Sequence, residues 1–573
     1  DIVTVVYDTF KKLYDKGLVY RAKRLVNYCV THQTAFSDLE VEYEEKEGRL
    51  YFIKYPLVGE EGHITVATTR PETMLGDTAV AVNPKDKRYK KFVGKRVLLP
   101  LVNREIPTIE DESVDMEFGT GAVKVTPAHD PADFEIGEKN NLQQISVIGF
   151  DGRMTNEVGQ YEGLAIKEAR EKILKELKAQ NLLEKEAPIT HRVGVCYKCK
   201  NPIEPLLLEQ WFVKTQPLAK PALEVVKIVK LKIYPAKFEK AYNQFLENIK
   251  DWNISRQIVW GIRIPAWKCE ECNEWTVTNG DSPTSCPKCN STKLTQDTDT
   301  FDTWFSSAQW PFATLKTTKP SDFEYFYPTT VMETAYDILR WWVARMVMVG
   351  IFVTGDIPFE NVLFHGLVKD PYGKKMSKSK GNVTDPLELV EQYGADAVRM
   401  ALVYGTAIGN DQSLSHPKLQ AMRNFTNKVW NIARFVLSHQ SQITNHLPAQ
   451  AGQSLNSDDK WIIEELNKTT ETTTKAIEQF RLHDAASEIY EFIWHKFADV
   501  YIEKTKDRRE EAQYPLLHVL DQSLRLLHPF MPFVTETIWQ LAKGKSKINP
   551  PAGGQKSKLF SEEALIIAQW PEK

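Results

Sequence analysis

Three lysines and two hydroxyl side chains lie together in one short stretch of the sequence, Lys374-Lys375-Met376-Ser377-Lys378-Ser379. Gly373 and Gly381 flank this stretch, and glycine favours a flexible loop. Lysine ammonium groups on flexible stems can follow the oxygens of a polyphosphate, and hydroxyl groups add hydrogen bonds to it. The stretch therefore indicates a loop that binds nucleotide phosphates, although an exposed basic loop without a ligand is the simpler interpretation.

Six of the seven cysteines occur as pairs separated by two residues. The pair Cys269 and Cys272 is followed, after 13 intervening residues, by the pair Cys286 and Cys289. Two such pairs can present four thiolates to one tetrahedral ion, so they predict a structural zinc site. A redox dithiol and two disulfides are the alternatives.

The third pair, Cys196 and Cys199, has candidate partners far away in the sequence. Cys29 and His32 show the same spacing, and the four residues together would make a site of three cysteines and one histidine. Such a site requires the intervening segment to be a domain looped out of the fold. His191 is an alternative fourth ligand, and three unliganded thiols are a further alternative.

The looped-out segment, from about 50 to 190, has the pattern of a separate α/β unit. Strands are predicted near 64–67 and 122–125, and apolar residues recur at helical spacing over 164–184. The strands adjoin two polar motifs, which run from Thr68 to Thr73 and from Gly119 to Asp130. Their hydroxyls, lysine and carboxylates could bind an ammonium group, a hydroxyl group and a water molecule. Each motif alone is also compatible with a polar turn.

Other elements are predicted from the same periodicity. An amphipathic helix begins at residue 2, and a strand over 361–364 leads into His365 and Gly366. From about residue 417 the pattern is helical, with separate stretches at 458–481, 484–506, 514–528 and one that begins at 528. Four or so helices with short breaks predict a helical bundle.

Composition limits the class of protein only broadly. A chain of 573 residues is too long for one core, and its apolar content of 42% is that of an ordinary soluble protein. We find no apolar run of about 18 residues, so no membrane association is expected. The net charge of −3 does not indicate a nucleic-acid-binding protein. Nothing points to an oxidising compartment, so we expect a cytoplasmic protein.

Eight motifs, in this order, resemble class I aminoacyl-tRNA synthetases and, within that class, the valyl-tRNA synthetases. They are TTRPET at 68–73, GTGAVKVTPAHD at 119–130, SRQ at 255–257, DTWFSS at 302–307, ETAYD at 333–337, WWVARM at 341–346, KMSKS at 375–379 and NFTNKVWN at 424–431. The isoleucine enzymes usually show DVWFDSG and GSDQHRGW instead. The chain departs from the usual valine pattern at Ile262, where histidine is typical. The His-x-Gly-His motif that class I enzymes place upstream is also missing, so we expect an internal fragment that activates valine poorly by itself.

The resemblance implies a role for each matching residue. In the KMSKS loop, Lys375 and Lys378 would be catalytic. ATP would be bound by His365, Gly366, Met376, Ser377, Ser379, Glu333 and Asp337. The valine pocket would be walled by Trp304, Ile338 and Trp342. A hydrolytic editing pocket would contain Thr69, Arg70, Thr73, Asp77, Lys124, Thr126, Asp130 and Asp133. In this pocket Asp133 is the candidate for the substrate ammonium, and Lys124 and Thr126 are candidates for positioning the ester or the hydroxyl of the wrong amino acid.

The resemblance also implies the fold and its division. We expect a multidomain α/β protein: the second half of a Rossmann-like catalytic fold, an inserted α/β editing domain, zinc-knuckle modules and an all-α bundle. The expected boundaries are a connecting segment at 1–49, the editing domain at 50–190, a return segment with zinc knuckles at 191–300, the Rossmann half at 301–415 and the anticodon-binding bundle at 416–573. The bundle is expected without the closing coiled coil that many valyl enzymes carry.

The function implied is that of a valine–tRNA ligase. The full reaction would activate valine with ATP and Mg²⁺, transfer it to the tRNA for valine, and hydrolyse mischarged threonyl-tRNA. One structural Zn²⁺ is expected and a second is considered, and a monomer is expected. An isoleucyl-tRNA synthetase is the alternative within the family. A free-standing aminoacyl-tRNA deacylase or tRNA-binding fragment is the alternative from another class.

Overall fold

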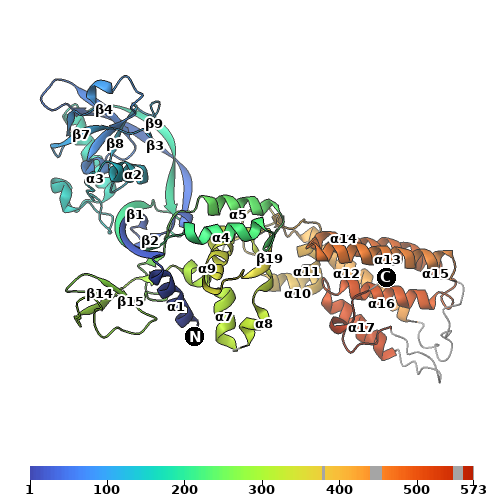
Figure 1. Cartoon of the computed structure of the whole chain (residues 1–573). Helices are drawn as coiled ribbons and strands as arrows, with labels where there is room; N and C mark the ends of the chain where they lie inside the picture. Colours follow the sequence, from blue (N-terminus) through green and yellow to red (C-terminus); the bar gives the residue numbers. More distant parts are fainter. Residues whose placement is uncertain (320, 377–380, 439–454, 546–558, 572–573) are drawn as a thin grey trace. The chain divides into compact units, whose positions relative to one another are not determined.

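The computed structural model describes residues 1–319, 321–376, 381–438, 455–545 and 559–571. These residues divide into two compact units (Figure 1). The first unit comprises 1–227, 244–328 and 340–358, and the second comprises 228–243, 329–339 and 359–573. Each unit therefore collects segments that are far apart in the sequence.

The first unit is built on an antiparallel sheet. Its strand order is β12-β10-β1-β2, with bounds β1 Val19–Cys29, β2 Thr34–Phe36, β10 Glu204–Val213 and β12 Trp252–Asn253. Helix α1 (Ile2–Asp15) buries Val6, Phe10 and Leu13. The Phe10 ring packs edge-on against Trp211 of β10 at 5.5 Å between ring centroids. The predicted opening helix is thus present and is anchored to this sheet by its apolar side.

A long two-stranded ribbon carries the inserted segment, as Figure 1 shows. β3 (Val41–Pro56) pairs antiparallel with β9 (Leu183–Cys196), and β4 (His63–Thr68) pairs with the far end of β3. A second sheet has the order β6-β7-β5-β8, with bounds β5 Ala79–Val82, β6 Arg96–Leu99, β7 Arg104–Glu110 and β8 Ala122–Val125. Helices α2 (Pro131–Lys139) and α3 (Ile166–Ala179) complete the insertion. The predicted strands and helix at 64–67, 122–125 and 164–184 correspond to β4, β8 and α3.

One apolar core joins the insertion to the sheet below it. Ile53 and Tyr55 of β3 share this core with Val26 of β1 and with Leu206 and Phe212 of β10. Burial of such side chains stabilises the contact by roughly 1.5–3 kcal/mol each. The insertion is therefore packed on its supporting sheet and not only tethered by the ribbon.

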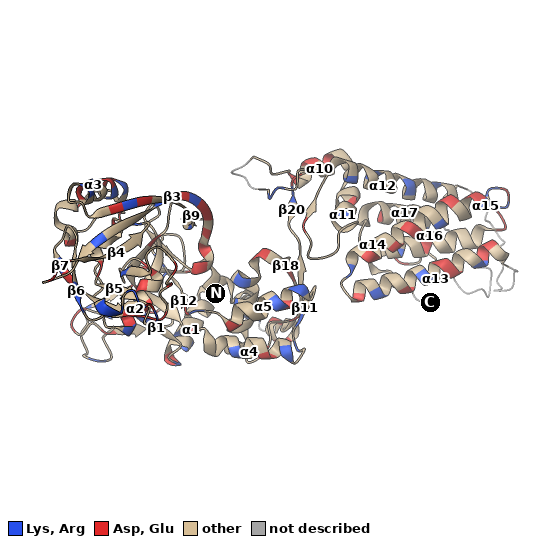
Figure 2. Cartoon of the chain, turned by 90° about the horizontal axis from the view of Figure 1, so that it is seen from above, with Lys and Arg blue, Asp and Glu red and all other residues tan. Residues whose placement is uncertain are grey.

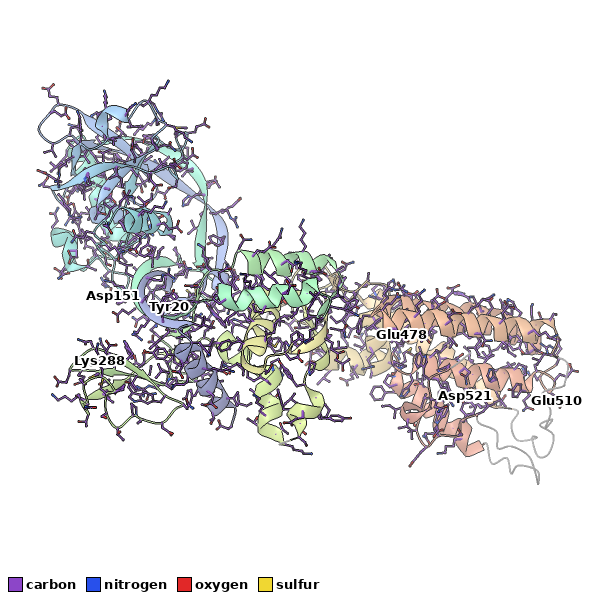
Figure 3. All side chains as sticks on the ribbon, viewed as in Figure 1. Tyr20, Asp151, Lys288, Glu478, Glu510 and Asp521 are labelled. Atoms are coloured by element: carbon purple, nitrogen blue, oxygen red, sulfur yellow. The ribbon has the colours of Figure 1, made fainter. Side chains whose placement is uncertain are left out.

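The rest of the first unit consists of a small cysteine module and a group of helices. The module is an antiparallel sheet of β14 (Ala266–Cys269), β15 (Trp275–Val277) and β16 (Leu294–Gln296), with Lys288 on its outer loop (Figure 3). β13 (Ser255–Arg256) pairs with β17 (Thr300–Phe301). The helices are α4 Gln216–Lys227, α6 Thr303–Ser307, α7 Trp310–Thr318, α8 Asp322–Phe326 and α9 Ala344–Thr354.

The second unit contains a parallel three-stranded sheet of order β11-β19-β18. The strands are β11 Lys232–Tyr234, β18 Thr329–Ala335 and β19 Phe359–His365. Helix α5 (Lys237–Glu247) follows β11, and β20 (Val368–Lys369) pairs with β21 (Gln412–Ser413). The predicted boundary at 301 is wrong for this sheet, because β11 lies within the segment assigned to the return. A strand of three residues is too short to show a periodic pattern.

The predicted helical bundle forms the rest of the second unit. Its helices are α10 Pro386–Tyr393, α11 Ala395–Val403, α12 His416–Leu437, α13 Ser457–Glu478, α14 Leu482–Glu491, a π-helical continuation Phe492–Ile502, α15 Glu503–Thr505, α16 Gln513–Leu527 and α17 Pro532–Lys545. Acidic and basic residues alternate over their outer surfaces (Figure 2). Asp521 is a buried exception (Figure 3), and it accepts hydrogen bonds from the Arg525 guanidinium and the Phe560 backbone.

Among the described residues, we find no helix that combines the length and the apolar character needed to cross a membrane.

Candidate functional site

The candidate hydrolytic pocket gathers four predicted residues from three separate segments. Asp77 follows a short helical turn, Thr73–Gly76. Lys124 lies on β8, Thr126 comes directly after it, and Asp133 lies in the first turn of α2. Gly76 allows the segments to approach closely, because a Cβ atom there would lie 3.2 Å from Thr126 Cγ2 and 2.9 Å from the Ile145 carbonyl oxygen.

Hydrogen bonds connect these four residues. Lys124 Nζ donates to Thr126 Oγ1 at 2.5 Å, and Thr126 Oγ1 donates to Asp77 Oδ1 at 2.6 Å. The Thr126 backbone N–H donates to Asp133 Oδ2 at 2.8 Å. Lys124 Nζ also lies 3.7 Å from Asp133 and 3.8 Å from Asp77. The Thr126 hydroxyl is therefore already occupied as donor and acceptor, which leaves Lys124 and Asp133 as the groups that can turn to a ligand.

Burial shifts the ionisation of these groups. Burial raises the pKa of the Asp133 carboxyl to about 7, and Lys124 opposes this shift without cancelling it. Burial also raises the pKa of Asp77. For Lys124 burial acts to lower the pKa, but the carboxylates Asp77 and Asp133 outweigh it and hold the pKa above the ordinary value. The pocket thus keeps the Lys124 cation between two buried carboxyl groups, and strongly shifted ionisation of this kind is typical of functional sites.

The other four residues predicted for this pocket lie in the loops and the helix end that surround it. Thr73 Oγ1 donates to the Arg70 carbonyl at 3.0 Å, which caps the local turn. Asp130 is exposed and accepts hydrogen bonds from the Ala132 and Asp133 backbone N–H groups as the N-cap of α2. Thr69 is half-buried beside Arg70. The structure thus gives Thr73 and Asp130 partners in the local backbone, and their place in the editing pocket stays a prediction.

Arg70 lies in a buried network of charges. Its guanidinium donates to Glu72 at 3.2 Å and forms an ion pair with Glu204 of β10. Glu72 is completely buried and also accepts two hydrogen bonds from Arg170, each at 2.8 Å. Burial acts to lower the pKa of Arg70, but the two carboxylates raise it, so the guanidinium stays charged. Arg70 therefore joins the pocket loop to the supporting sheet.

Sequence reasoning missed three residues of this region. Tyr55 donates to Asp77 Oδ2 at 2.6 Å, and Glu204 holds Arg70. His129 Nε2 accepts from the Val147 N–H at 2.8 Å while Nδ1 lies 3.3 Å from the Pro205 carbonyl oxygen. Burial lowers the pKa of His129 to about 3, so it is a neutral structural histidine. His129 lies within a polar motif, and Glu204 precedes a proline. No local pattern in the sequence marks Tyr55, because its partner Asp77 is 22 residues away.

Both predicted cysteine sites are assembled. The ligand atoms of Cys29, His32, Cys196 and Cys199 lie within 4.8 Å of one another. The ligand atoms of Cys269, Cys272, Cys286 and Cys289 do the same. His191, the alternative ligand, instead faces Gly48 across the ribbon, where a Cβ would lie 2.7 Å from its ring. Four soft donors in a cluster of this size fit tetrahedral Zn²⁺.

The candidate ATP residues lie on and after the parallel strands of the second unit. Lys375 Nζ lies 3.7 Å from Asp337, and His365 Nε2 lies 3.3 Å from Glu333. Gly366 permits close packing, because a Cβ there would lie 1.9 Å from the Asn410 carbonyl oxygen. Met376 is half-buried. Ser377, Lys378 and Ser379 lie outside the described residues.

Trp342, one of the candidate valine-pocket residues, lies in a π-helical turn, Leu339–Val343. In the first unit Trp304 packs on Trp341 at 5.5 Å between ring centroids, and Trp342 Nε1 donates to the Ser307 carbonyl at 2.9 Å. Ile338 belongs to the second unit. Turns of this kind are frequent at functional sites, and the role of Trp304, Ile338 and Trp342 in a valine pocket stays a prediction.

A buried hub fixes the helix that carries Trp304. Asp302 accepts from the Trp304 backbone N–H at 3.2 Å and from Trp252 Nε1 at 2.8 Å. Arg256 and Arg345 lie 3.2 and 3.4 Å from the same carboxylate. Two guanidinium groups thus pair with one buried carboxyl group at this position.

The fold and the sites define a class of protein, and comparison with known proteins agrees. Residues 1–415 match the family described as tRNA synthetases class I (I, L, M and V), and residues 459–573 match the anticodon-binding domain of tRNA ligase. The chain belongs to the class I tRNA synthetase family.

Within that family, the chain is similar to curated valine–tRNA ligases. It is 50% identical to the valine–tRNA ligase of Carboxydothermus hydrogenoformans over 99% of this chain and 63% of that protein. It is 48% identical to the valine–tRNA ligase of Dehalococcoides mccartyi over 100% of this chain and 64% of that protein. The chain thus spans slightly less than two thirds of the length of these relatives.

A solved structure gives the same fold. It is the ternary complex of Agrobacterium radiobacter K84 agnB2 LeuRS-tRNA-LeuAMS, with a TM-score of 0.52 and 20% identity. The match covers 94% of this chain and 73% of that chain.

Proposed function

We propose that this chain acts in valine–tRNA ligation and that its inserted domain hydrolyses threonyl-tRNA charged to the tRNA for valine. The observation that carries the proposal is the buried Lys124–Asp133 pair at 3.7 Å, in which Lys124 belongs to the second motif that resembles the editing pocket and Asp133 follows that motif. The similarity to valine–tRNA ligases at about half identity supports valine over isoleucine. The motifs DTWFSS and ETAYD support the same choice.

A hydrolytic site has a clear purpose for this substrate. Threonine has nearly the shape of valine with a hydroxyl in place of a methyl group, so an apolar synthetic pocket rejects it only weakly. A second pocket with the opposite chemistry removes the error. Polar groups there accept the hydroxyl that valine lacks, and the difference in binding becomes a difference in hydrolysis.

The chemistry assigned to the pocket uses two of its residues. Asp133 binds the ammonium group of the threonyl ester, and Lys124 stabilises the negative charge that develops on the ester carbonyl oxygen. Water forms the new bond to the carbonyl carbon, the bond to the ribose oxygen breaks, and that oxygen takes up a proton. Thr126 and Asp77 hold the lysine, as their hydrogen bonds indicate.

The ligation half of the proposal rests on the second unit and on the resemblance. Lys375 and Lys378 would contact the triphosphate, with Mg²⁺ shared among its oxygens, while Glu333, Asp337, His365 and Gly366 would contact the adenosine. Met376, Ser377 and Ser379 would complete this loop. The helical bundle would bind the anticodon arm. The two cysteine clusters would each hold a structural Zn²⁺, which stabilises the local fold and takes no part in the reaction.

The test is hydrolysis of threonyl-tRNA bearing the valine anticodon by the purified chain, compared with valyl-tRNA. We expect rapid release of threonine and slow release of valine. Asp133→Asn should reduce threonine release at least 100-fold, because it removes the charge that binds the ammonium group. Glu135→Gln is the matched control, since Glu135 is an exposed carboxylate on the same helix.

Three outcomes separate the alternatives. Equal loss in both variants would contradict the Asp133 role. Equal hydrolysis of threonyl- and valyl-tRNA would contradict discrimination by the hydroxyl. Hydrolysis of valyl-tRNA bearing the isoleucine anticodon in preference to threonyl-tRNA would favour the isoleucine enzyme. Valine-dependent exchange of pyrophosphate into ATP tests the ligation half separately.

A further inference from the structure

A tyrosine outside every motif reaches the base of the hydrolytic pocket. Tyr55 lies near the end of β3, has no exposed surface, and belongs to the core that joins the insertion to its supporting sheet. Its hydroxyl nevertheless donates a hydrogen bond to Asp77 Oδ2 at 2.6 Å. A buried tyrosine needs a partner for its hydroxyl, but the partner here is a functional carboxylate and not a backbone carbonyl.

Three consecutive hydrogen bonds connect Tyr55 to Lys124. Tyr55 donates to Asp77 Oδ2, Thr126 donates to Asp77 Oδ1 at 2.6 Å, and Lys124 donates to Thr126 Oγ1 at 2.5 Å. Asp77 and Thr126 have no exposed surface, whereas Lys124 is 8% exposed at the open end of the chain. Both oxygens of Asp77 are therefore occupied by neutral donors, and the carboxylate is fixed in one orientation.

We propose that Tyr55 is a positioning residue for the hydrolytic reaction, acting through Asp77 and Thr126 to hold the Lys124 ammonium against the substrate ester. This inference rests on the proposed function of the pocket. Without the Tyr55 hydroxyl, Asp77 can rotate away from Thr126, and the lysine loses its fixed acceptor. A buried chain of charged and neutral hydrogen bonds is worth more than its separate pairs, so loss at one end is felt at the other.

The charged groups around Asp77 decide how pH should report this role. Asp77 faces Tyr55 from β3, Lys124 from β8 and Arg104 from β7, and Asp133 lies beyond Lys124. Burial raises the pKa of Asp77, while Lys124, Thr126, Tyr55 and Arg104 each lower it. Removal of the Tyr55 donor therefore raises the pKa of Asp77 further, so Asp77 takes up a proton at a higher pH than before.

The experiment measures threonyl-tRNA hydrolysis against pH for the wild-type chain, Tyr55→Phe and Tyr161→Phe. Tyr161 is the matched control, because it is also fully buried in the insertion and donates at 2.5 Å to a carboxylate, Glu176, away from the pocket. We expect Tyr55→Phe to reduce the rate about 10-fold, the loss typical of one hydrogen bond to a charged group. We also expect the acid limb of its pH profile to move to higher pH, whereas Tyr161→Phe should leave the limb in place.

A second variant guards against a simple folding defect. Asp77→Asn keeps the shape of the side chain but cannot ionise, so it should be slower than the wild type at every pH and should keep only the rise in rate that follows ionisation of Asp133. Circular dichroism and thermal unfolding establish that each variant is folded before rates are compared.

The outcomes are distinguishable. If Tyr55→Phe and Tyr161→Phe lose the same factor and neither moves the acid limb, Tyr55 is only a structural residue and the inference is overturned. If the folded wild-type chain does not hydrolyse threonyl-tRNA at all, the proposed function fails, and this inference fails with it. A 10-fold loss with a shifted limb in Tyr55→Phe alone supports both.

Discussion

The candidate hydrolytic pocket and the candidate ATP site are built in opposite ways. In the pocket, Asp77 and Thr126 have no exposed surface, and Asp133 is 5% exposed. In the ATP site, the side chains of Lys375 and Glu333 are 67% and 55% exposed. Ion pairs in water are worth little, whereas buried charges interact strongly and shift each other's ionisation. The hydrolytic pocket is therefore preorganised by its own fold, and the ATP site presents solvated groups to a ligand.

The difference matches the two proposed tasks. Recognition of one small ammonium and one hydroxyl requires fixed donors and acceptors in a dry pocket, since water would compete for each of them. A triphosphate carries its own strong charges and its own Mg²⁺, and exposed lysines suffice to attract it. The predictions below ask how far each site depends on its surroundings.

The largest expected effect is in the support of the buried pocket. Glu72→Ala should lower the free energy of unfolding of the first unit by about 3–5 kcal/mol, because it removes the buried carboxylate that Arg170 pairs with and leaves Arg70 with Glu204 alone. Urea unfolding measures the change. Glu186→Ala is the control, because Glu186 pairs with Lys178 and Arg49 at the surface, and it should cost less than 1 kcal/mol. Similar losses in the free energy of unfolding for both variants would show that the ion pairs of Glu72 are as solvated as those of Glu186.

The second prediction concerns how ionisation of the buried Asp133 lowers the free energy of unfolding. Because its pKa is raised to about 7 from the ordinary 3.8, the folded chain holds a proton there between about pH 4 and 7 that the unfolded chain has released. Stability therefore falls as the pH rises through this window. Asp133→Asn removes the titration, so at pH 8 it should be more stable than the wild type by about 4 kcal/mol, and at pH 4 the two should be nearly equal.

Thermal unfolding of both proteins at pH 4, 6 and 8 tests this dependence. The variant should gain stability while it loses hydrolysis, which is the usual opposition between stability and function at an active site. Hydrolysis by the wild type should rise with pH through about 7, as Asp133 becomes ionised. A difference in stability that does not change with pH would mean that Asp133 is ionised throughout this range.

The sequence predicted the parts of the molecule that local patterns encode. Helix α1, the strands β4 and β8, both cysteine clusters and four pocket residues all carry a signal within a few neighbouring residues. Tyr55 and β11 do not. Tyr55 acquires its role from a partner that only the folded sheet brings close, and β11 is identified only by pairing with β19, about 130 residues later. The backbone hydrogen bonds of Thr73 and Asp130 were not predicted for the same reason, since a polar motif does not say which of its side chains bond to the backbone.

The third prediction concerns strain beside the ATP-site sheet. Val229 precedes β11 with φ at 60°, a left-handed conformation that strongly disfavours a β-branched residue. Val229→Gly should therefore raise the free energy of unfolding of the second unit by about 1 kcal/mol. Ile228→Gly is the control, because Ile228 is a neighbouring exposed residue without a positive φ, and there glycine should be neutral or destabilising. Destabilisation by both variants would show that Val229 is not strained.

The smallest expected effect is at the ATP site itself. Asp337→Asn should change the free energy of unfolding by less than about 0.5 kcal/mol, because Asp337 meets Lys375 at 3.7 Å with side chains that are 37% and 67% exposed. Differential scanning calorimetry in low and high salt measures it, with Glu72→Ala as the contrasting buried carboxylate. A loss of several kcal/mol from Asp337→Asn would erase the contrast between the two sites, because it would mean that the ATP site is also held by its own charges. A negligible loss would mean that Asp337 is not needed by the fold and is available to a ligand.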